Sequence, residues 1–183
     1  MLVQGAFATS VEADAMQGLL ARDPEDMSTR IKLLGYFFNH SFQEEAADGQ
    51  YISQVLWLME HHPEEPALSL SVARFEAGRH PAAYEQAKQL WQQYLEGPYQ
   101  ENLDVLWNAA AFLADADAEL AARYLRRGIA LQPAELMWQE KLGSLLAGRR
   151  KSRPWKATFE TLEGSLSEKN AIDLFDLNYC SLY

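Results

Sequence analysis

The chain has 183 residues, 48% of them hydrophobic, and a formal net charge of −10 at pH 7. This length suits one globular domain with a buried core, and the apolar content argues against a disordered chain. The acidic balance argues against a general nucleic-acid binder, because neutralising phosphates requires a basic face.

Apolar residues at three- and four-residue spacing predict five helices in the first half of the chain. Their expected ranges are 10–22, 28–38, 51–61, 66–78 and 81–95. Ser10 can cap the first helix, and either Asp26 or Ser28 can begin the second. The buried side of the first helix is expected to carry Val11, Ala15, Met16, Leu19 and Leu20. The pattern then breaks before the third helix, where Asp48-Gly49 predicts a turn.

Five more helices are predicted in the second half of the chain. Their expected ranges are 102–113, 117–131, 136–147, 155–162 and 165 onward. Asn102 can cap the first of these, and Pro133 follows the second, because proline lacks an N–H and disfavours helical geometry in the residue before it. A polar, basic connection follows Gly148, and Ser165 and Glu168 have the spacing of a capping box. About ten helices without a credible strand pair predict an all-α fold.

Four helix-ending prolines recur at a nearly constant interval. They are Pro24, Pro63, Pro98 and Pro133, which lie 39, 35 and 35 residues apart. Each one closes an amphipathic stretch, and another helix is predicted within a few residues. Such a period is typical of stacked helix pairs, because each pair leaves an apolar face that only its neighbour covers.

The repeat resembles the tetratricopeptide repeat, whose units of about 34 residues form two antiparallel helices. The stretch 102–135 is the best match, since it has the family's small and large packing residues and its closing proline. These residues are Ala109, Phe112, Ala121, Leu125, Gly128 and Pro133. Leu142-Gly143 matches the Leu-Gly pair of the family in the next unit, and Leu34-Gly35 is similar near the start.

The resemblance implies a right-handed superhelical stack of antiparallel helix pairs in a single domain, 1–183. Its expected parts are a leading helix at 11–24, units at 26–63, 66–98, 102–135 and 136–163, and a capping helix or tail at 164–183. The unit at 66–98 fits least well, and the first unit contains an insertion around 41–50. Because this architecture binds many unrelated partners, the resemblance implies a binding module without naming the partner.

Polar side chains on the predicted first helices could hold a partner in the inner groove of such a stack. In some tetratricopeptide domains, Lys and Asn residues bind the terminal carboxylate of a peptide. The residues roughly placed for this role are Arg30, Lys32, Asn39, Arg74 and Asn108. They do not reproduce the family pattern, so we expect the groove to contact an extended or helical peptide mainly through apolar and aromatic residues.

Positive charge is concentrated between residues 123 and 156. This range has a net charge of +7, whereas residues 1–122 have 19 acidic side chains against six Lys or Arg, a net charge of −13. The basic block is either a solvated face or a docking site for an anionic partner. The docking residues would lie on a loop and are Arg149, Arg150, Lys151, Arg153 and Trp155. Opposite charge at the two ends also permits head-to-tail self-association into a homo-oligomer.

The sequence disfavours RNA and membranes as partners. The pentatricopeptide family has a similar period and binds RNA across a basic groove, but the acidic residues 1–122 argue against nucleic acid along most of the stack. No apolar run approaches the roughly 20 residues that cross a bilayer. No secretory signal is convincing, and we expect a cytoplasmic protein.

No combination of residues predicts catalysis, a cofactor or a metal site. Adjacent residues on a helix point about 100° apart, so His61 and His62 cannot chelate one ion together. Cys180 is the single cysteine and has no histidine at a catalytic spacing. We expect no enzyme, since catalysis would require groups brought together across several repeats.

The final stretch AIDLFDLNYCSLY is unusually apolar. Its apolar residues either cap the last repeat or belong against another molecule. The leading prediction is a non-enzymatic module that binds a peptide or protein partner through a concave helical face and the basic loop. The alternative is a self-associating regulatory or assembly protein that uses this apolar terminal helix.

Overall fold

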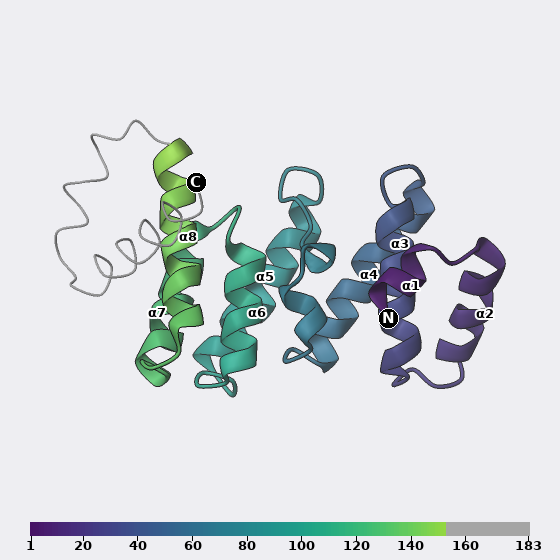
Figure 1. The fold of residues 1–183 in the computed structure, drawn as a ribbon. Coiled ribbons are helices and arrows are strands. Elements are labelled where there is room, and N and C mark those ends of the chain that lie inside the picture. The colour runs from purple at the N-terminus through teal and green to yellow at the C-terminus, as the bar shows by residue number, and fades with distance from the viewer. Residues whose placement is uncertain (153–183) are drawn as a thin grey trace. The chain divides into compact units, whose positions relative to one another are not determined.

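The computed structural model describes residues 1–152 of the chain (Figure 1). Within this range the structure has eight α-helices, two short 3₁₀-helices and no strand, which confirms the all-α prediction for the described residues. The α-helices are α1 (Leu2–Ala6), α2 (Ser10–Leu20), α3 (Met27–His40), α4 (Glu45–His61), α5 (Pro81–Glu96), α6 (Leu103–Leu113), α7 (Ala118–Leu131) and α8 (Leu136–Ser152). The 3₁₀-helices are η1 (Pro66–Ser69) and η2 (Ser71–Ala73). None of the helices in this range is long and apolar enough to span a membrane.

Contacts within the chain divide it into two compact units. Unit 1 is Met1–Pro98 and contains α1 to α5 with η1 and η2, and unit 2 begins at Tyr99 and contains α6 to α8.

In unit 1 the short helix α1 crosses α3 with almost no space between the two backbones. Two glycines make this approach possible. A Cβ atom on Gly5 would collide with the backbone of Lys32, and one on Gly35 would collide with the backbone of Leu2. Gly35 belongs to the Leu-Gly pair noted in the sequence, and its partner here is α1, which the sequence pattern did not predict.

The N-cap of helix α2 is Thr9 and not the predicted Ser10. Thr9 and Glu12 form a capping box, in which the backbone N–H of Thr9 donates to Glu12 Oε2 at 2.7 Å. The predicted buried side is also wrong for most of its members. Ala13 and Leu20 are buried on α2, whereas Val11 is 76% exposed and Leu19 is 50% exposed.

Helix α3 begins after Asp26, whose carboxylate accepts from the backbone N–H of Thr29 at 3.1 Å. Of the two residues predicted to begin this helix, Asp26 is therefore the cap.

The predicted turn at Asp48-Gly49 is wrong, because α4 already begins at Glu45. The residues buried on α4 recur at a spacing of about four, namely Ala47, Tyr51, Val55, Leu58 and Met59. Ala47 thus extends the buried stripe by one helical turn before Tyr51. Burying this first part of the helix outweighs the preference of an Asp-Gly pair for a reverse turn.

The helix predicted over 66–78 is also wrong. The chain forms η1 and η2 instead, and between them Leu70 has an extended backbone with φ −83° and ψ 159°. The hydroxyl of Ser69 donates to the carbonyl of Pro66 at 2.8 Å, a local bond that competes with the helical pattern. Leu68 and Ala73 are nevertheless fully buried, so these apolar residues contribute to the core without a continuous α-helix.

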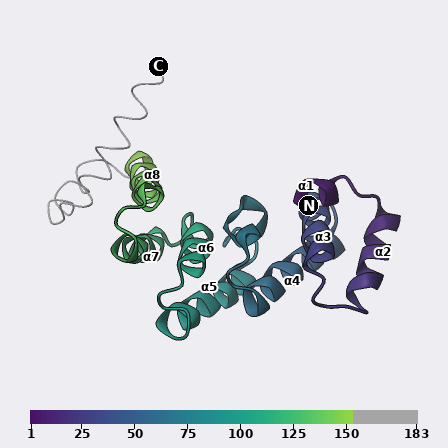
Figure 2. The same cartoon turned by 60° about the horizontal axis from the view of Figure 1, so that its bottom comes forward.

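Unit 2 follows the sequence prediction closely. Asn102 accepts from the backbone N–H of Val105 at 3.0 Å and caps α6, and Asp117 accepts from that of Leu120 at 3.2 Å and caps α7. Helix α7 packs on α6 and on α8, as both ribbon views show (Figures 1 and 2). The successive antiparallel neighbours bury their apolar stripes against each other.

Helix α8 continues to Ser152, so the expectation of a basic loop directly after Gly148 is wrong. Arg149, Arg150 and Lys151 lie on this helix. The helices predicted at 155–162 and from 165 onward, including the capping box, lie outside the described residues.

Candidate functional site

Two tryptophans, one from α6 and one from α8, pack against each other in unit 2. The rings of Trp107 and Trp138 meet edge to face, with centroids 5.1 Å apart and an interplanar angle of 87°. Trp138 is 2% exposed, whereas Trp107 is half-buried and presents part of its ring to solvent. An edge-to-face pair of this kind is worth about 1 kcal/mol beyond the area it buries.

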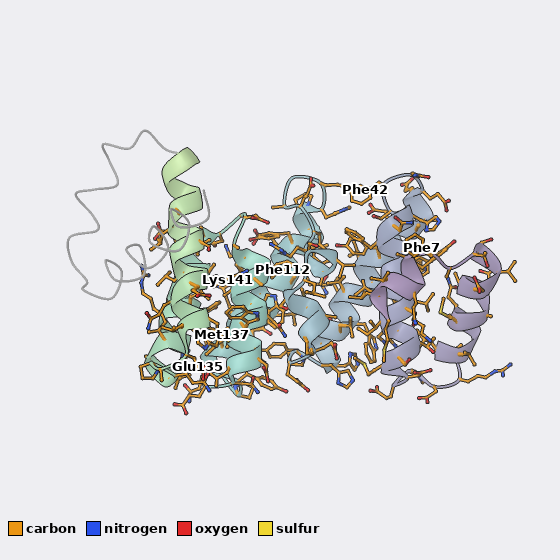
Figure 3. The ribbon with its side chains drawn as sticks, in the orientation of Figure 1. Phe7, Phe42, Phe112, Glu135, Met137 and Lys141 are labelled. Carbon is orange, nitrogen blue, oxygen red and sulfur yellow. The ribbon has the colours of Figure 1, made fainter. Side chains whose placement is uncertain are left out.

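A cationic side chain borders Trp107, and an exposed apolar side chain lies on the same helix as this cation. The ammonium Nζ of Lys141 lies 5.6 Å from the centre of the Trp107 ring, within the range of a cation–π interaction. Met137, one turn earlier on α8, is 48% exposed, and Figure 3 shows it on the same helix as Lys141. We call Trp107, Met137 and Lys141 the α6–α8 face.

The position of Trp138 depends on a glycine of α7. A Cβ atom on Gly128 would lie 2.6 Å from Cδ2 of the Trp138 ring and closer still to two other ring atoms. The indole N–H of Trp138 donates to Gln132 at 3.4 Å. Gly128 and Gln132 therefore hold the buried ring in one place, and that ring in turn supports Trp107.

Unit 1 contains an aromatic cleft of about 180 Å³ where the end of α3, the start of α4 and the segment 71–80 meet. Its apolar lining consists of Phe38, Phe42, Tyr51 and Phe75, and its polar lining of Ser41, Ser71, Arg74, Glu76, Arg79 and His80. Phe42 is 66% exposed at the rim, where Figure 3 shows it in the segment after α3. Arg79 lies over its ring, 5.0 Å from the centroid.

The charges around this cleft compensate one another. Arg79 pairs with Asp48 at 3.0 Å, and the same carboxylate lies 3.4 Å from Nε2 of His80. Arg79 also donates to the carbonyl of Ser41. These contacts join the segment after α3 to the start of α5, so we assign them to holding the cleft together and not to binding an anion.

Tyr51 forms the floor of the cleft. Burial, reinforced by the nearby Asp48, raises the pKa of Tyr51 well above its usual range. The hydroxyl therefore stays protonated and donates to the carbonyl of Arg74 at 3.2 Å. It fixes the backbone of the segment that carries Arg74.

The structure places two of the predicted groove residues in the interior. Arg30 is 5% exposed, donates to Gln54 at 2.8 Å and to the carbonyl of Pro24 at 2.7 Å, and lies 3.3 Å above the Trp57 ring. Burial lowers the pKa of Arg30. Asn108 is 1% exposed. Neither side chain is presented to a partner.

The other three predicted groove residues lie in unit 1, at separate places. Lys32 lines a cleft of about 320 Å³ between α1, α2 and α3, together with Glu12 and Met16. Asn39 donates to the carbonyl of Ala6 at 3.1 Å, and Arg74 lines the aromatic cleft. The structure does not gather the five residues into one clamp.

The predicted basic docking residues are only partly described. Arg149, Arg150 and Lys151 are in the last turns of α8, and Arg153 and Trp155 lie outside the described residues. Lys141 lies in the basic range 123–156, whereas the sequence pattern assigned no binding role to Trp107 or Trp138. The signal that connects them is a tryptophan near the start of two successive first helices, with a lysine three residues after the second tryptophan.

His61 and His62 contact different groups, as their helical spacing predicts. His61 stacks on Trp57 with ring centroids 4.3 Å apart, and His62 lies 3.0 Å from a carboxylate oxygen of Glu25. In residues 1–152, no group of three or more His, Cys, Asp or Glu side chains is arranged to hold a metal ion.

Comparison of the chain with known protein families, with curated proteins and with solved structures finds no match.

Proposed function

We propose that this chain is a non-enzymatic cytoplasmic interaction module that binds a peptide or protein partner through the α6–α8 face. We further propose that its helix pairs belong to a tetratricopeptide-like stack, in which this face forms part of the concave surface. The observation that carries the proposal is the partly exposed Trp107, which packs on Trp138 and has the ammonium group of Lys141 near its ring, together with the exposed Met137 on the same helix as Lys141.

The proposed stack is supported by the contact between α7 and the next helix. Gly128 of α7 receives the ring of Trp138 on α8, so the second helix of one pair packs against the first helix of the following pair. This is the kind of neighbour contact on which repeat proteins depend. The interval of 35 residues between Pro98 and Pro133 agrees with the same unit length.

The chemistry of the α6–α8 face favours a peptide with an apolar anchor next to an acidic group. A supported tryptophan offers apolar contact area at low entropic cost, which is typical of binding hot spots. A methionine is flexible and adapts to partners of different shape. Lys141 would attract a carboxylate close to that anchor. Arg149, Arg150, Lys151 and Arg153 supply further positive charge later in the sequence, and this charge would steer an anionic partner.

A selection from a randomised peptide library displayed on phage, with the wild-type chain as bait, tests the proposal. A selected peptide is labelled with fluorescein and titrated with the wild-type chain and with the Met137→Glu and Trp107→Ala variants. Each variant should raise the dissociation constant by about tenfold or more, because each removes part of the anchor contact.

The control is Leu70→Glu, which introduces the same charge at an apolar residue that is 47% exposed in unit 1. It should leave the dissociation constant within about twofold of the wild-type value. The proposal is wrong if Met137→Glu and Trp107→Ala bind as well as this control, or if the library yields no peptide that binds.

Neutralising Arg149, Arg150, Lys151 and Arg153 together tests the second part of the proposal. The association rate should fall and its dependence on salt should weaken, since these charges act through long-range attraction. An unchanged association rate at low salt would remove these residues from the binding surface.

A further inference from the structure

The sequence after the described residues contains a segment with the chemistry that the α6–α8 face favours. Residues 171–183, AIDLFDLNYCSLY, have two acidic side chains and no basic one. In the stretch IDLFDL, Asp173 and Asp176 each have a large apolar residue on both sides. We call residues 171–183 the tail segment. It offers an apolar anchor next to a carboxylate at two places.

The α6–α8 face and its surroundings offer apolar contact area to such a segment. Met137 is 48% exposed, and Trp107 is half-buried. Leu136, beside Met137 at the start of α8, is 56% exposed, and Leu131 at the end of α7 is 39% exposed. Three of the ten large hydrophobic residues exposed in the described part of the chain therefore lie within residues 131–137. A concentration of this kind indicates an interaction surface.

The net charges of the two parts are opposite. Helices α7 and α8 with the turn between them, residues 118–152, contain seven Lys or Arg and three acidic side chains, a net charge of +4. Residues 157–183 contain five acidic side chains and one lysine, a net charge of −4. Opposite charges of this size attract and orient two segments before they touch. Charge complementarity therefore favours the tail segment as the occupant of the face.

The chain between α8 and the tail segment is long enough to bring the two together. Lys141 lies 11 residues before the end of α8 at Ser152, a distance of about 16 Å along a helix. Residues 153–170 separate Ser152 from the tail segment, and a chain of this length spans up to about 60 Å. The tail segment can therefore reach the face of its own chain.

We propose that the tail segment binds the α6–α8 face of its own chain and so competes with an outside partner. The inference rests on the proposed function, because it takes the same face as the binding site and names one occupant of it. Apolar side chains of the tail segment cover Trp107 and Met137, and one of its carboxylates lies near the ammonium group of Lys141. A partner must displace the tail segment before it can bind.

The attachment of the segment to the same chain determines the size of the effect. A tethered segment acts at an effective concentration of about 1 mM. With an intrinsic dissociation constant of about 0.1 mM or lower, it occupies the face in about nine of ten chains or more. An outside ligand for the same face then binds at least about tenfold more weakly than it binds to a free face.

A fluorescein-labelled synthetic peptide with the sequence of residues 171–183, in which Ser replaces Cys180, is the probe. It is titrated with the wild-type chain, the Leu174→Ser/Phe175→Ser variant and the Phe159→Ser control. Phe159 is also followed by an acidic residue but lies outside the tail segment. The double variant should bind the peptide about tenfold or more tightly than the wild-type chain, because its own tail segment no longer competes. The control should remain within about twofold of the wild-type chain.

Further variants locate the site. Met137→Glu, added to the double variant, should raise the dissociation constant of the peptide by about tenfold or more. A library peptide selected for the α6–α8 face should lose affinity through Met137→Glu by a larger factor in the double variant than in the wild-type chain. The reason is that in the wild-type chain the same substitution also weakens the competing tail segment. Circular dichroism checks that each variant keeps its helices.

The inference is overturned if the double variant binds the tail peptide no more tightly than the Phe159→Ser control, or if Met137→Glu leaves that binding unchanged. A library peptide that depends on Trp107 and Met137, together with a tail peptide that does not bind, would overturn this inference alone and leave the proposed function standing. If neither peptide binds, both are wrong.

Sedimentation velocity distinguishes binding within one chain from binding between two copies. The wild-type chain should keep the mass of one chain at the concentrations of the titration. Larger species that form in the wild-type chain and disappear in the Leu174→Ser/Phe175→Ser variant would show that the tail segment binds another copy. The proposed binding within one chain would then be wrong.

Discussion

Replacing Gly128 by Ala tests whether this glycine is required by the ring of Trp138. A Cβ at Gly128 would lie 2.6 Å from Cδ2 of that ring, whereas carbon atoms in contact are about 3.5–4.0 Å apart. The ring must therefore move by about 1 Å. Trp138 is 2% exposed and packs against Trp107, so the ring has little room in which to move.

Two opposing effects determine the size of the change. Alanine is favoured over glycine inside a helix by about 1 kcal/mol. Overpacking of a tight core costs about 1–3 kcal/mol, and a rigid buried indole belongs at the upper end of that range. We therefore expect Gly128→Ala to lower the free energy of unfolding of unit 2 by about 2 kcal/mol.

Urea unfolding followed by tryptophan fluorescence and circular dichroism measures this change. Gly49→Ala is the matched control, because Gly49 lies within α4 and a Cβ there meets no atom within 4 Å. It should raise stability by about 0.5–1 kcal/mol. With Trp138→Leu already present, Gly128→Ala should lose most of its penalty or become stabilising, since the clashing ring is gone.

The reasoning is refuted if Gly128→Ala is as stable as the wild-type chain. It is also refuted if the penalty persists at the same size in the Trp138→Leu background, because the cost would then have another origin.

Two further predictions concern unit 1. Arg30→Lys should lower the free energy of unfolding by about 1–3 kcal/mol and change the fluorescence of Trp57. The reason is that lysine cannot make the planar contact with the Trp57 ring or the forked hydrogen bonds of the guanidinium. A loss below about 0.5 kcal/mol in urea unfolding would contradict this role. The hydroxyl and backbone N–H of Thr29 lower the pKa of Asp26, so its stabilising effect is present above the pKa of the unfolded chain, about 4, and is lost as pH falls through the lower folded value. The side chain of Asp26→Asn keeps an oxygen that can accept from Thr29 but does not titrate. In urea unfolding between about pH 5 and pH 2, the free energy of unfolding of this variant should therefore depend less on pH than that of the wild-type chain. Identical pH dependence of the two chains would contradict the assignment.

The first residues of several helices could be predicted from the sequence immediately around them. Asn102 was predicted as a cap, and Asp26 was one of two residues predicted to begin α3, because a capping side chain bonds to a backbone N–H only three residues away. The ranges of α6 and α7 followed from such caps and from apolar spacing. Thr9 was missed in favour of Ser10, since both residues are good caps and the choice depends on where Glu12 can reach back.

The candidate surfaces could be predicted less well from the sequence. The apolar residues of α2 gave a correct helix and a wrong buried side, because apolar spacing does not say which of two possible sides meets a neighbour. Arg30 and Asn108 were treated as groove residues, although both are buried. Only the packing of α3 and α6 against their neighbours decided that these polar side chains face inward.

The sequence by itself determined that the described residues are mainly helical and where several of the helices begin. These properties depend on contacts between residues within about four positions of one another, which a linear pattern records. Only the tertiary structure decided that 66–78 would not form a helix, that α1 would pack on Gly35, and that Trp107 would rest on Trp138. Each of these depends on atoms far apart in the chain competing for the same space.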